Sequence, residues 1–189
     1  MPNLEQPVQV RVPSSKVNRG MLSGSFNSHY ETPDPIYNDM DKIFHFKIDL
    51  CANPRNHKHK NYFCDGHRDS LKQKWYKHSP CWMNPPYDNV GPFMQKAWAE
   101  SQVGATIVCL VAVRTDTDWF HDYILDSAGA RYLIVLKRRI RFWYNRDPKG
   151  AGPSPAFPSV IAIYSPDAIP SVLALTTIGG HQCRVLSLK

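Results

Sequence analysis

The sequence has no apolar run long enough to cross a membrane, which is the first limit on its function. A membrane-spanning helix needs about 20 mostly apolar residues, and none of the 189 residues lie in such a stretch. The first residues, MPNLEQPVQVRV, also lack the apolar core of a secretory signal peptide. We therefore expect a cytoplasmic protein without a membrane partner.

Regularly spaced cysteines are absent as well. The chain has five cysteines, an odd number, so we expect reduced thiols rather than a disulfide framework. One pattern is compatible with a tetrahedral zinc site, since Cys64-x2-His67 and His78-x2-Cys81 each pair a thiol with an imidazole. Zinc sites usually begin with two closely spaced cysteines, and such pairs arise by chance in a chain with eight histidines. We therefore expect no metal.

Negative charge is in short supply relative to positive charge. Lys and Arg number 23 against 16 Asp and Glu, a net charge of +7, which favours an anionic partner. Hydrophobic residues make up 42% of the chain and charged residues 21%, so there is material for one core and most of the chain should fold. Residues 1–27 are poor in large apolar groups and predict a poorly ordered basic tail, followed by a single domain over 28–189.

The positive charge is concentrated in two stretches. Residues 54–77 carry a net charge of +5 and residues 131–150 carry +6, so the remainder of the chain is net acidic at −4. Two solvated loops would explain this pattern. A groove that binds phosphates is the better explanation, because aromatic side chains alternate with the cations; these are Trp75, Tyr76, Phe142, Trp143 and Tyr144.

The periodicity of apolar residues predicts alternating helices and strands, and thus a three-layer α/β fold. Thr32 is expected to cap the first helix, with Pro33 at its first position. The run from 105 to 113 is apolar throughout, as in a strand covered on both faces. The expected helices are 33–44, one starting at 91, one around 119–124 and a short one at 172–175. The expected strands are 46–51, 81–83, 105–113, 132–136 paired with 140–143 as a hairpin, 159–164 and a short one in the last segment, with a loop over 54–79.

The most informative motif is Asn84-Pro85-Pro86-Tyr87, directly after the predicted strand 81–83. Ligands of open α/β sheets bind at this carboxyl end of the strands. The Asn84 side-chain oxygen and the Pro85 carbonyl are two acceptors on a backbone that the prolines hold rigid, which suits a planar amine with two N–H groups. Tyr87 could stack on the ring that bears the amine. The alternative is a tight polar turn with a buried tyrosine.

This motif resembles the catalytic motif of methyltransferases that act on amino groups of DNA. From about residue 30 to residue 164, the chain is similar to the small phage-type DNA N6-adenine methyltransferases, the Dam-like family. The similar segments occur in the same order: Tyr30-Glu31-Thr32-Pro33, Ile48-Asp49-Leu50-Cys51-Ala52-Asn53, Asp69-Ser70-Leu71 with Trp75, Asn84-Pro85-Pro86-Tyr87 with Gly91-Pro92-Phe93, Val113-Arg114-Thr115-Asp116-Thr117 with Trp119-Phe120, Arg139-Ile140-Arg141-Phe142 and Pro155-Ala156-Phe157-Pro158-Ser159.

The resemblance implies a compact Rossmann-like fold with a mixed sheet that binds S-adenosylmethionine. It also implies direct methyl transfer to the N6 amine of an adenine flipped out of double-stranded DNA. Catalysis would rest on Asn84, Pro85, Pro86 and Tyr87. The implied cofactor contacts are Tyr30, Thr32, Pro33, Asp49, Cys51 and Asp69. The basic stretches supply candidate phosphate contacts: Lys58, Lys60, Arg68, Lys72, Lys74, Arg138, Arg139 and Arg141.

The chain departs from the pattern of larger methyltransferases in two respects. Cys51-Ala52-Asn53-Pro54 contains none of the glycines that often follow the first strand and let the cofactor approach. Only 35 positions separate Asp49 from Asn84, so the usual second and third strand–helix units do not fit fully, and there is no room for a separate target-recognition domain. Any sequence preference must therefore come from the basic stretches. GATC is a frequent target in the family, but no residue here reads it out.

Two other interpretations stay open. The same motif occurs in methyltransferases that modify cytosine, RNA guanine or protein glutamine, and a nucleic-acid-binding module without catalysis would also explain the charge. The family resemblance implies a phage or prophage source, with the protein acting in the bacterial host cell. In that cell, methylation of the phage DNA would protect this DNA from host restriction.

Overall fold

A seven-stranded mixed sheet organises the computed structural model, which describes residues 30–64, 69–126, 129–143 and 155–189. The expected tail, residues 1–27, lies outside the described residues. The strands are β1 (Ile48–Asp49), β2 (Cys81–Met83), β3 (Ile107–Ala112), β4 (Tyr132–Leu136), β5 (Ser159–Tyr164), β6 (Thr177–Ile178) and β7 (His181–Ser187). The helices are α1 (Asp34–Phe44), α2 (Val90–Gln102), α3 (Asp118–Phe120), which continues as a π-helical turn (His121–Leu125), and α4 (Pro170–Leu173). Two 3-10 turns, η1 (Ser70–Lys72) and η2 (Trp75–His78), lie between β1 and β2.

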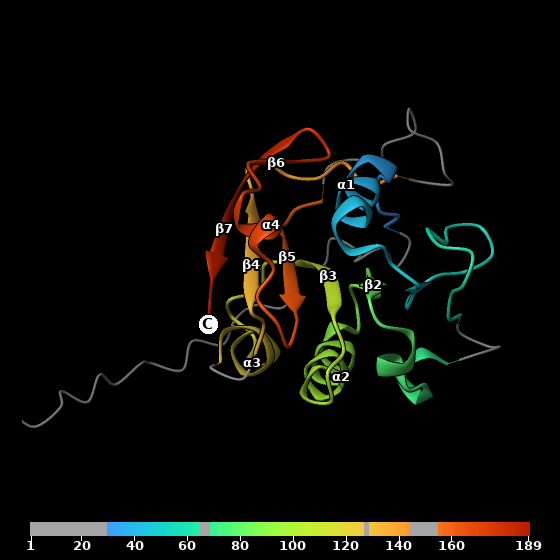
Figure 1. Cartoon of the computed structure of the whole chain (residues 1–189). Coiled ribbons are helices and arrows are strands. Elements are labelled where there is room, and N and C mark those ends of the chain that lie inside the picture. Colours follow the sequence, from blue (N-terminus) through green and yellow to red (C-terminus); the bar gives the residue numbers. More distant parts are fainter. Residues whose placement is uncertain (1–29, 65–68, 127–128, 144–154) are drawn as a thin grey trace, which may run out of the picture.

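The direction of the strands decides where a ligand can bind. The order across the sheet is β1-β2-β3-β5-β4-β7-β6, and Figure 1 labels each of these strands except β1. β1, β2 and β3 are parallel, and β5 is antiparallel to both β3 and β4, so β4 points the same way as the first three strands. The carboxyl ends of β1, β2, β3 and β4 therefore share one edge of the sheet.

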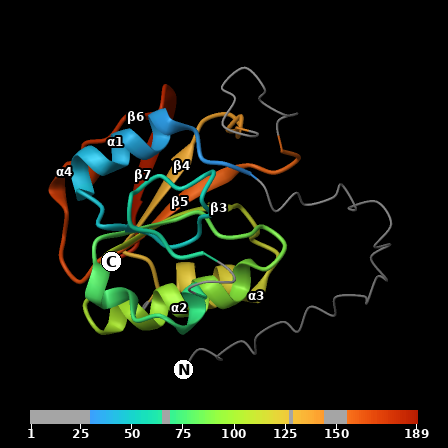
Figure 2. The same cartoon turned by 90° about the vertical axis from the view of Figure 1, so that its right-hand side faces the viewer.

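Helices cover both faces of this sheet. Figure 2 shows α1 and α4 on one side and α2 and α3 on the other. Successive residues of β3 point to opposite faces of the sheet and belong to two different hydrophobic cores. Cys109 packs on the α2 side and Leu110 on the α1 side. All six residues of β3 are buried, which confirms a strand covered on both faces. In the described part of the chain, no helix is both long enough and apolar enough to span a bilayer.

The expected boundaries around α1 and β1 need correction. The helix begins at Asp34 with Pro33 as its N-cap, so Thr32, which is buried, is not the cap. The strand expected over 46–51 pairs only at Ile48–Asp49. At both ends of the expected strand, a side chain rather than a neighbouring strand accepts the backbone N–H. The Asp41 carboxylate accepts from the Phe46 N–H, and the Asp49 carboxylate accepts from the Cys51 N–H.

The hairpin expected from 132–136 and 140–143 is wrong. β4 is flanked by β5 and β7, so it has no open edge for residues 140–143. After β4 the chain turns at Arg138, whose φ is +74°. The segment that follows instead places Trp143 against Glu31, and their backbones form a two-bond antiparallel bridge. The short strand expected in the last segment is β7, which has seven residues.

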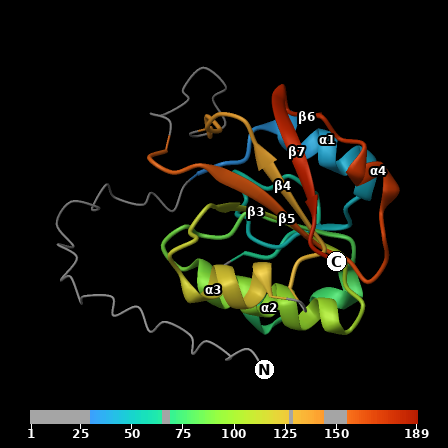
Figure 3. The same cartoon turned by 90° about the vertical axis from the view of Figure 1, so that its left-hand side faces the viewer.

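The β6–β7 hairpin closes the sheet beside α1 and α4, as Figure 3 shows. Its turn contains Gly179 and Gly180, with φ of +54° and +78°, a region that L side chains rarely adopt. The Gly179 N–H donates to the Asp39 carboxylate of α1 at 2.8 Å. A Cβ at Gly179 would lie 2.5 Å from Cγ1 of Ile36, whereas nothing lies within 4 Å of a Cβ at Gly180.

These two glycines form a matched test of the packing against α1. We expect Gly180→Ala to lower the free energy of unfolding by about 1–2 kcal/mol, from the left-handed backbone alone. Gly179→Ala should cost about 1–3 kcal/mol more, because the added methyl overpacks the contact with Ile36. Urea denaturation of both variants measures the difference, and equal destabilisation would contradict the tight contact.

Candidate active site

A cavity of about 540 Å³ opens at the edge where β1 and β2 end. It gathers residues that are far apart in the sequence. From the expected cofactor contacts, the cavity wall includes Tyr30, Thr32, Asp49, Cys51 and Asp69, and from the motif it includes Asn84, Pro85 and Pro86. Pro33 and Tyr87 do not line it: Pro33 caps α1, and Tyr87 packs in an aromatic cluster beside it.

Asn84, which lines the cavity, is held by one end of its side-chain amide. Its Nδ2 donates to the Tyr30 carbonyl at 2.8 Å. A carbonyl can only accept, so this bond fixes which end of the amide is which. The other end, Oδ1, is buried and has no hydrogen-bond partner among the described residues. A buried acceptor without a donor is costly, so Asn84 is prepared to receive an N–H from a ligand.

Tyr87 belongs to an aromatic cluster that also contains Tyr30, Phe142 and Phe157. Its ring stacks on Phe157, with centroids 5.1 Å apart and an interplanar angle of 24°. The rings of Tyr30 and Phe142 lie nearly perpendicular to that of Tyr87, with centroids 5.4 Å and 5.7 Å from its centroid. Burial raises the pKa of the Tyr87 hydroxyl far above its ordinary value, so the phenol is neutral. The cluster is uncharged, and Tyr30 connects it to Asn84.

Asp49 organises the loop that forms one wall. Its side chain is buried, and its two oxygens accept the backbone N–H groups of Cys51 at 3.2 Å and Lys58 at 3.0 Å. Burial raises the pKa of Asp49, and the two amide hydrogen bonds oppose that shift by stabilising the carboxylate. A loop without glycine is thus pinned in place by a carboxylate at the end of β1.

Sequence reasoning missed two asparagines of this loop. Asn53 and Asn56 line the cavity, and the Asn53 Oδ1 accepts the Arg55 N–H at 2.8 Å. The Asn56 Oδ1 accepts the Asn53 N–H at 2.7 Å. The signal was present in the sequence, because an asparagine followed by Pro54 is typical of a side-chain-stabilised turn.

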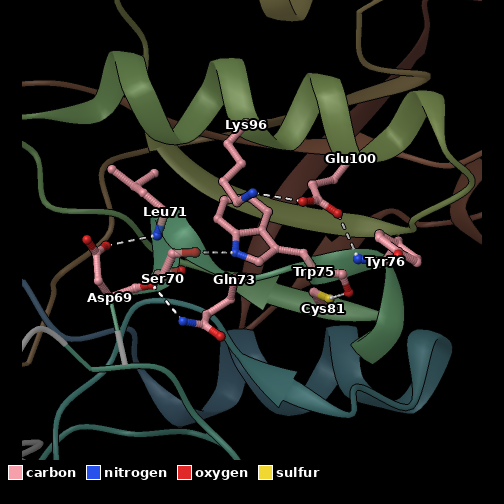
Figure 4. A network of polar contacts seen from close by, with 9 residues as sticks. All are labelled: Asp69, Ser70, Leu71, Gln73, Trp75, Tyr76, Cys81, Lys96 and Glu100. Carbon is pink, nitrogen blue, oxygen red and sulfur yellow. Dashed lines mark hydrogen bonds and ion pairs between the residues drawn. The ribbon is translucent and has the colours of Figure 1, made fainter. Parts of the chain in front are cut away.

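Another part of the cavity wall comes from Asp69, Ser70 and Leu71 at η1, which Figure 4 shows together with residues of η2. Asp69 accepts the Leu71 N–H at 3.1 Å and pairs with Lys72 at 3.2 Å. The indole of Trp75 is fully buried and donates to the Ser70 carbonyl at 2.9 Å. These bonds stabilise helical turns near Leu71 and Trp75 and place Asp69 at the cavity.

Helix α2 holds this wall through Glu100, as Figure 4 shows. The buried Glu100 carboxylate accepts the Tyr76 N–H at 2.9 Å and the Lys96 ammonium at 2.8 Å. Lys96 also lies 5.1 Å from the centroid of the Trp75 ring. On the other side, the Cys81 thiol donates to the Trp75 carbonyl, and burial raises the pKa of Cys81 to about 12. The thiol is therefore a packed core group.

The candidate phosphate contacts fall into different environments. Arg138, Arg139 and Arg141 are exposed and follow β4, so they lie at the same edge of the sheet as Asn84. Lys60 and Lys74 are exposed, and Lys72 pairs with Asp69. Lys58 is different, because its side chain is only 7% exposed. Arg68 lies outside the described residues.

The residues of the possible zinc site do not converge in the described chain. His67 lies outside it, and the ring of His78 packs edge-on against Phe63 at 5.5 Å. Within residues 30–64, 69–126, 129–143 and 155–189, no group of three Cys, His, Asp or Glu side chains could hold a metal ion.

Comparison with known proteins connects this geometry to a family. Residues 22–181 match the family model described as DNA N-6-adenine-methyltransferase (Dam). The chain belongs to the Dam family. A relative named DNA N-6-adenine-methyltransferase, from Haemophilus phage HP1 (strain HP1c1), is 28% identical over 158 residues, which cover 82% of this chain and 88% of the relative. The resemblance seen in the sequence is confirmed, and the enzyme class is that of adenine-specific DNA methyltransferases.

The contact between α2 and the η1–η2 wall can be tested at Glu100. We expect Glu100→Ala to lower the free energy of unfolding by about 1–3 kcal/mol, because the Tyr76 N–H and Lys96 lose their acceptor in a partly buried site. Gln95→Ala, on the exposed side of α2, should change it by less than about 0.5 kcal/mol. Chemical denaturation measures the free energy of unfolding of both variants. An unchanged free energy of unfolding in Glu100→Ala would contradict the role of the network.

Proposed function

We propose that this chain transfers a methyl group from S-adenosylmethionine to the N6 amine of adenine in double-stranded DNA. The observation that carries the proposal is the buried, unpartnered Oδ1 of Asn84 at the wall of a cavity. An exocyclic amine with two N–H groups is the donor that this oxygen and the neighbouring Pro85 carbonyl suit. Membership of the Dam family supports the same substrate.

We further propose that the fold is a three-layer Rossmann-like fold. Helices on both faces of the sheet support this assignment, as does a cavity at the carboxyl ends of parallel strands. The antiparallel β5, inserted between β3 and β4, is compatible with it because β4 keeps the direction of β1–β3.

The cavity fits the proposed cofactor in size and in chemistry. Its volume of about 540 Å³ lies in the usual range for small-molecule sites. Asp49 and Asp69 place negative charge beside it, which suits a cationic sulfonium and ribose hydroxyl groups. Thr32 lies just before α1, where the positive end of the helix dipole suits a carboxylate. These three residues and Cys51 are the proposed cofactor contacts.

In the reaction, the bound cofactor would supply an electrophilic methyl group. Asn84 and Pro85 would accept hydrogen bonds from the adenine amine, whose lone pair is otherwise delocalised into the ring. These hydrogen bonds favour a more tetrahedral nitrogen and aim its lone pair into the cavity. Pro85 and Pro86 hold both acceptors rigid, so catalysis is mainly positioning. The nitrogen would release one proton to water as its new bond to carbon forms and the carbon–sulfur bond of the methyl donor breaks. The donor would leave as a neutral thioether, so no covalent enzyme intermediate is needed.

The adenine must leave the duplex to reach Asn84. The aromatic cluster beside Asn84 offers ring faces that could receive the base, with Tyr87 next to the acceptors. Phe157 covers one face of Tyr87 in this structure, so the base would contact the exposed side of the cluster or displace Phe157. We also propose that the protein acts in a bacterial host cell, as its phage relative implies, and protects DNA from restriction there.

The reaction is tested with S-adenosylmethionine labelled in its methyl group. Unmethylated DNA should yield labelled N6-methyladenine, and Asn84→Ala should reduce the rate by at least about 100-fold, as expected when an oriented acceptor for the reacting amine is removed. Asn89→Ala is the matched control, since Asn89 also lines the cavity but carries no proposed role. Label in RNA but not in DNA would refute the proposal.

The three arginines after β4 are tested by DNA binding. We expect Arg138→Ala, Arg139→Ala and Arg141→Ala together to weaken DNA binding. The slope of log affinity against log salt should become shallower by about 0.9 for each DNA phosphate that the variant no longer neutralises. The removal of Lys189, which follows β7 at the opposite edge of the sheet, should leave the slope unchanged. Fluorescence anisotropy at several salt concentrations measures both, and equal slopes would contradict the assignment.

A further inference from the structure

We propose that Lys58 is a positioning residue of the cofactor site rather than a phosphate contact. Its ammonium holds the loop of residues 50–58 against α1 and against the ring of Trp143. This inference rests on the proposed function, because it assigns the loop to S-adenosylmethionine.

The surroundings of the Lys58 side chain carry the proposal. Although it belongs to a basic stretch, the side chain is only 7% exposed. Its ammonium forms an ion pair with Asp34, the first residue of α1, and lies 5.0 Å from the centroid of the Trp143 ring. A cation over an aromatic ring and beside a carboxylate has little to gain from a phosphate.

The main chain of Lys58 links the same residue to the cavity. Its N–H donates to Asp49, so the backbone is fixed by the end of β1 while the side chain is fixed by α1. Lys58 itself lines the cavity together with Asn53 and Asn56 of the same loop. Without the ammonium, the loop would keep its backbone hydrogen bond to Asp49 but would lose the contacts of Lys58 with Asp34 and Trp143.

Lys58 also joins the cofactor wall to the DNA-facing edge. Trp143 forms a backbone bridge with Glu31, and the neighbouring Tyr30 carbonyl orients Asn84. The ammonium thus contacts Trp143, which follows the exposed arginines in the sequence. Through the bridge to Glu31 and the Tyr30 carbonyl, Trp143 is connected to the Asn84 amide. Lys60, two positions after Lys58, carries the same charge but is exposed to solvent.

The experiment compares Lys58→Met with Lys60→Met, a matched pair of charge removals. Isothermal titration of S-adenosylmethionine without DNA measures cofactor affinity directly, independently of turnover. We expect Lys58→Met to weaken binding by about tenfold or more, which corresponds to ~1.4 kcal/mol. Lys60→Met should bind like the wild type, and Lys58→Arg should restore most of the affinity, since guanidinium can pair with Asp34 and stack on Trp143.

The pH profile gives a second readout. Among the described residues, the charged or titratable groups that interact electrostatically with Asp49 are Lys58, His57 and Tyr37. Lys58 and His57 lower the pKa of Asp49, which burial raises. Protonation of Asp49 removes an acceptor from the loop, so cofactor affinity should fall as the pH falls. With the Lys58 charge gone, this fall should begin at a higher pH in Lys58→Met than in the wild type or in Lys60→Met.

Each outcome has a defined meaning. Wild-type affinity in Lys58→Met, together with a lower salt slope for DNA, would overturn the inference and make Lys58 a phosphate contact. Failure of the wild type to bind S-adenosylmethionine would overturn the proposed function, and the inference with it. If Lys58→Met does not fold, Asp34→Asn removes the partner from the exposed side, and it should weaken cofactor binding in the same direction without changing the salt slope.

Discussion

The hydrogen bond from Asn84 to the Tyr30 carbonyl is the interaction on which the site depends. It joins the end of β2 to a segment 54 residues earlier in the chain, and it is the reason that the acceptor end of the Asn84 amide is left without a partner. The Tyr30 segment has no strand of its own to hold it. Its position comes from the adjoining Glu31–Trp143 bridge and from α1, which follows at Asp34. The Asn84 amide is therefore oriented by a backbone segment that is bridged to Trp143, two positions after the exposed Arg141.

This arrangement explains how so short a chain can form the cavity. Between Asp49 and Asn84, the described residues form two 3-10 turns before β2, where a longer enzyme would have further strand–helix units. The cavity wall on that side is fixed instead by side chains: the buried Asp49 carboxylate pins one loop, and Trp75 with Glu100 fixes the other. Buried polar groups with several partners act here in place of regular secondary structure.

The sequence predicts the local parts of this structure and fails on the non-local ones. Short-range patterns predict strand β2, the motif after it and the fully apolar β3. The family resemblance predicts that Thr32 and Asp49 lie near each other, and both line the cavity. The hairpin over 140–143 fails because β5, which comes later in the chain, takes the place beside β4. No pattern within residues 132–143 can contain that information.

Charge shows the same limit from another side. Lys58 and Lys60 are alike in any composition or charge pattern, and only their neighbours in space separate them. One meets Asp34 and Trp143, which come from segments 24 and 85 positions away, while the other faces solvent. A basic stretch therefore predicts that a chain binds an anion, but not which of its cations do so. In this protein the difference matters, because the buried cation lines the cavity and also contacts α1 and Trp143.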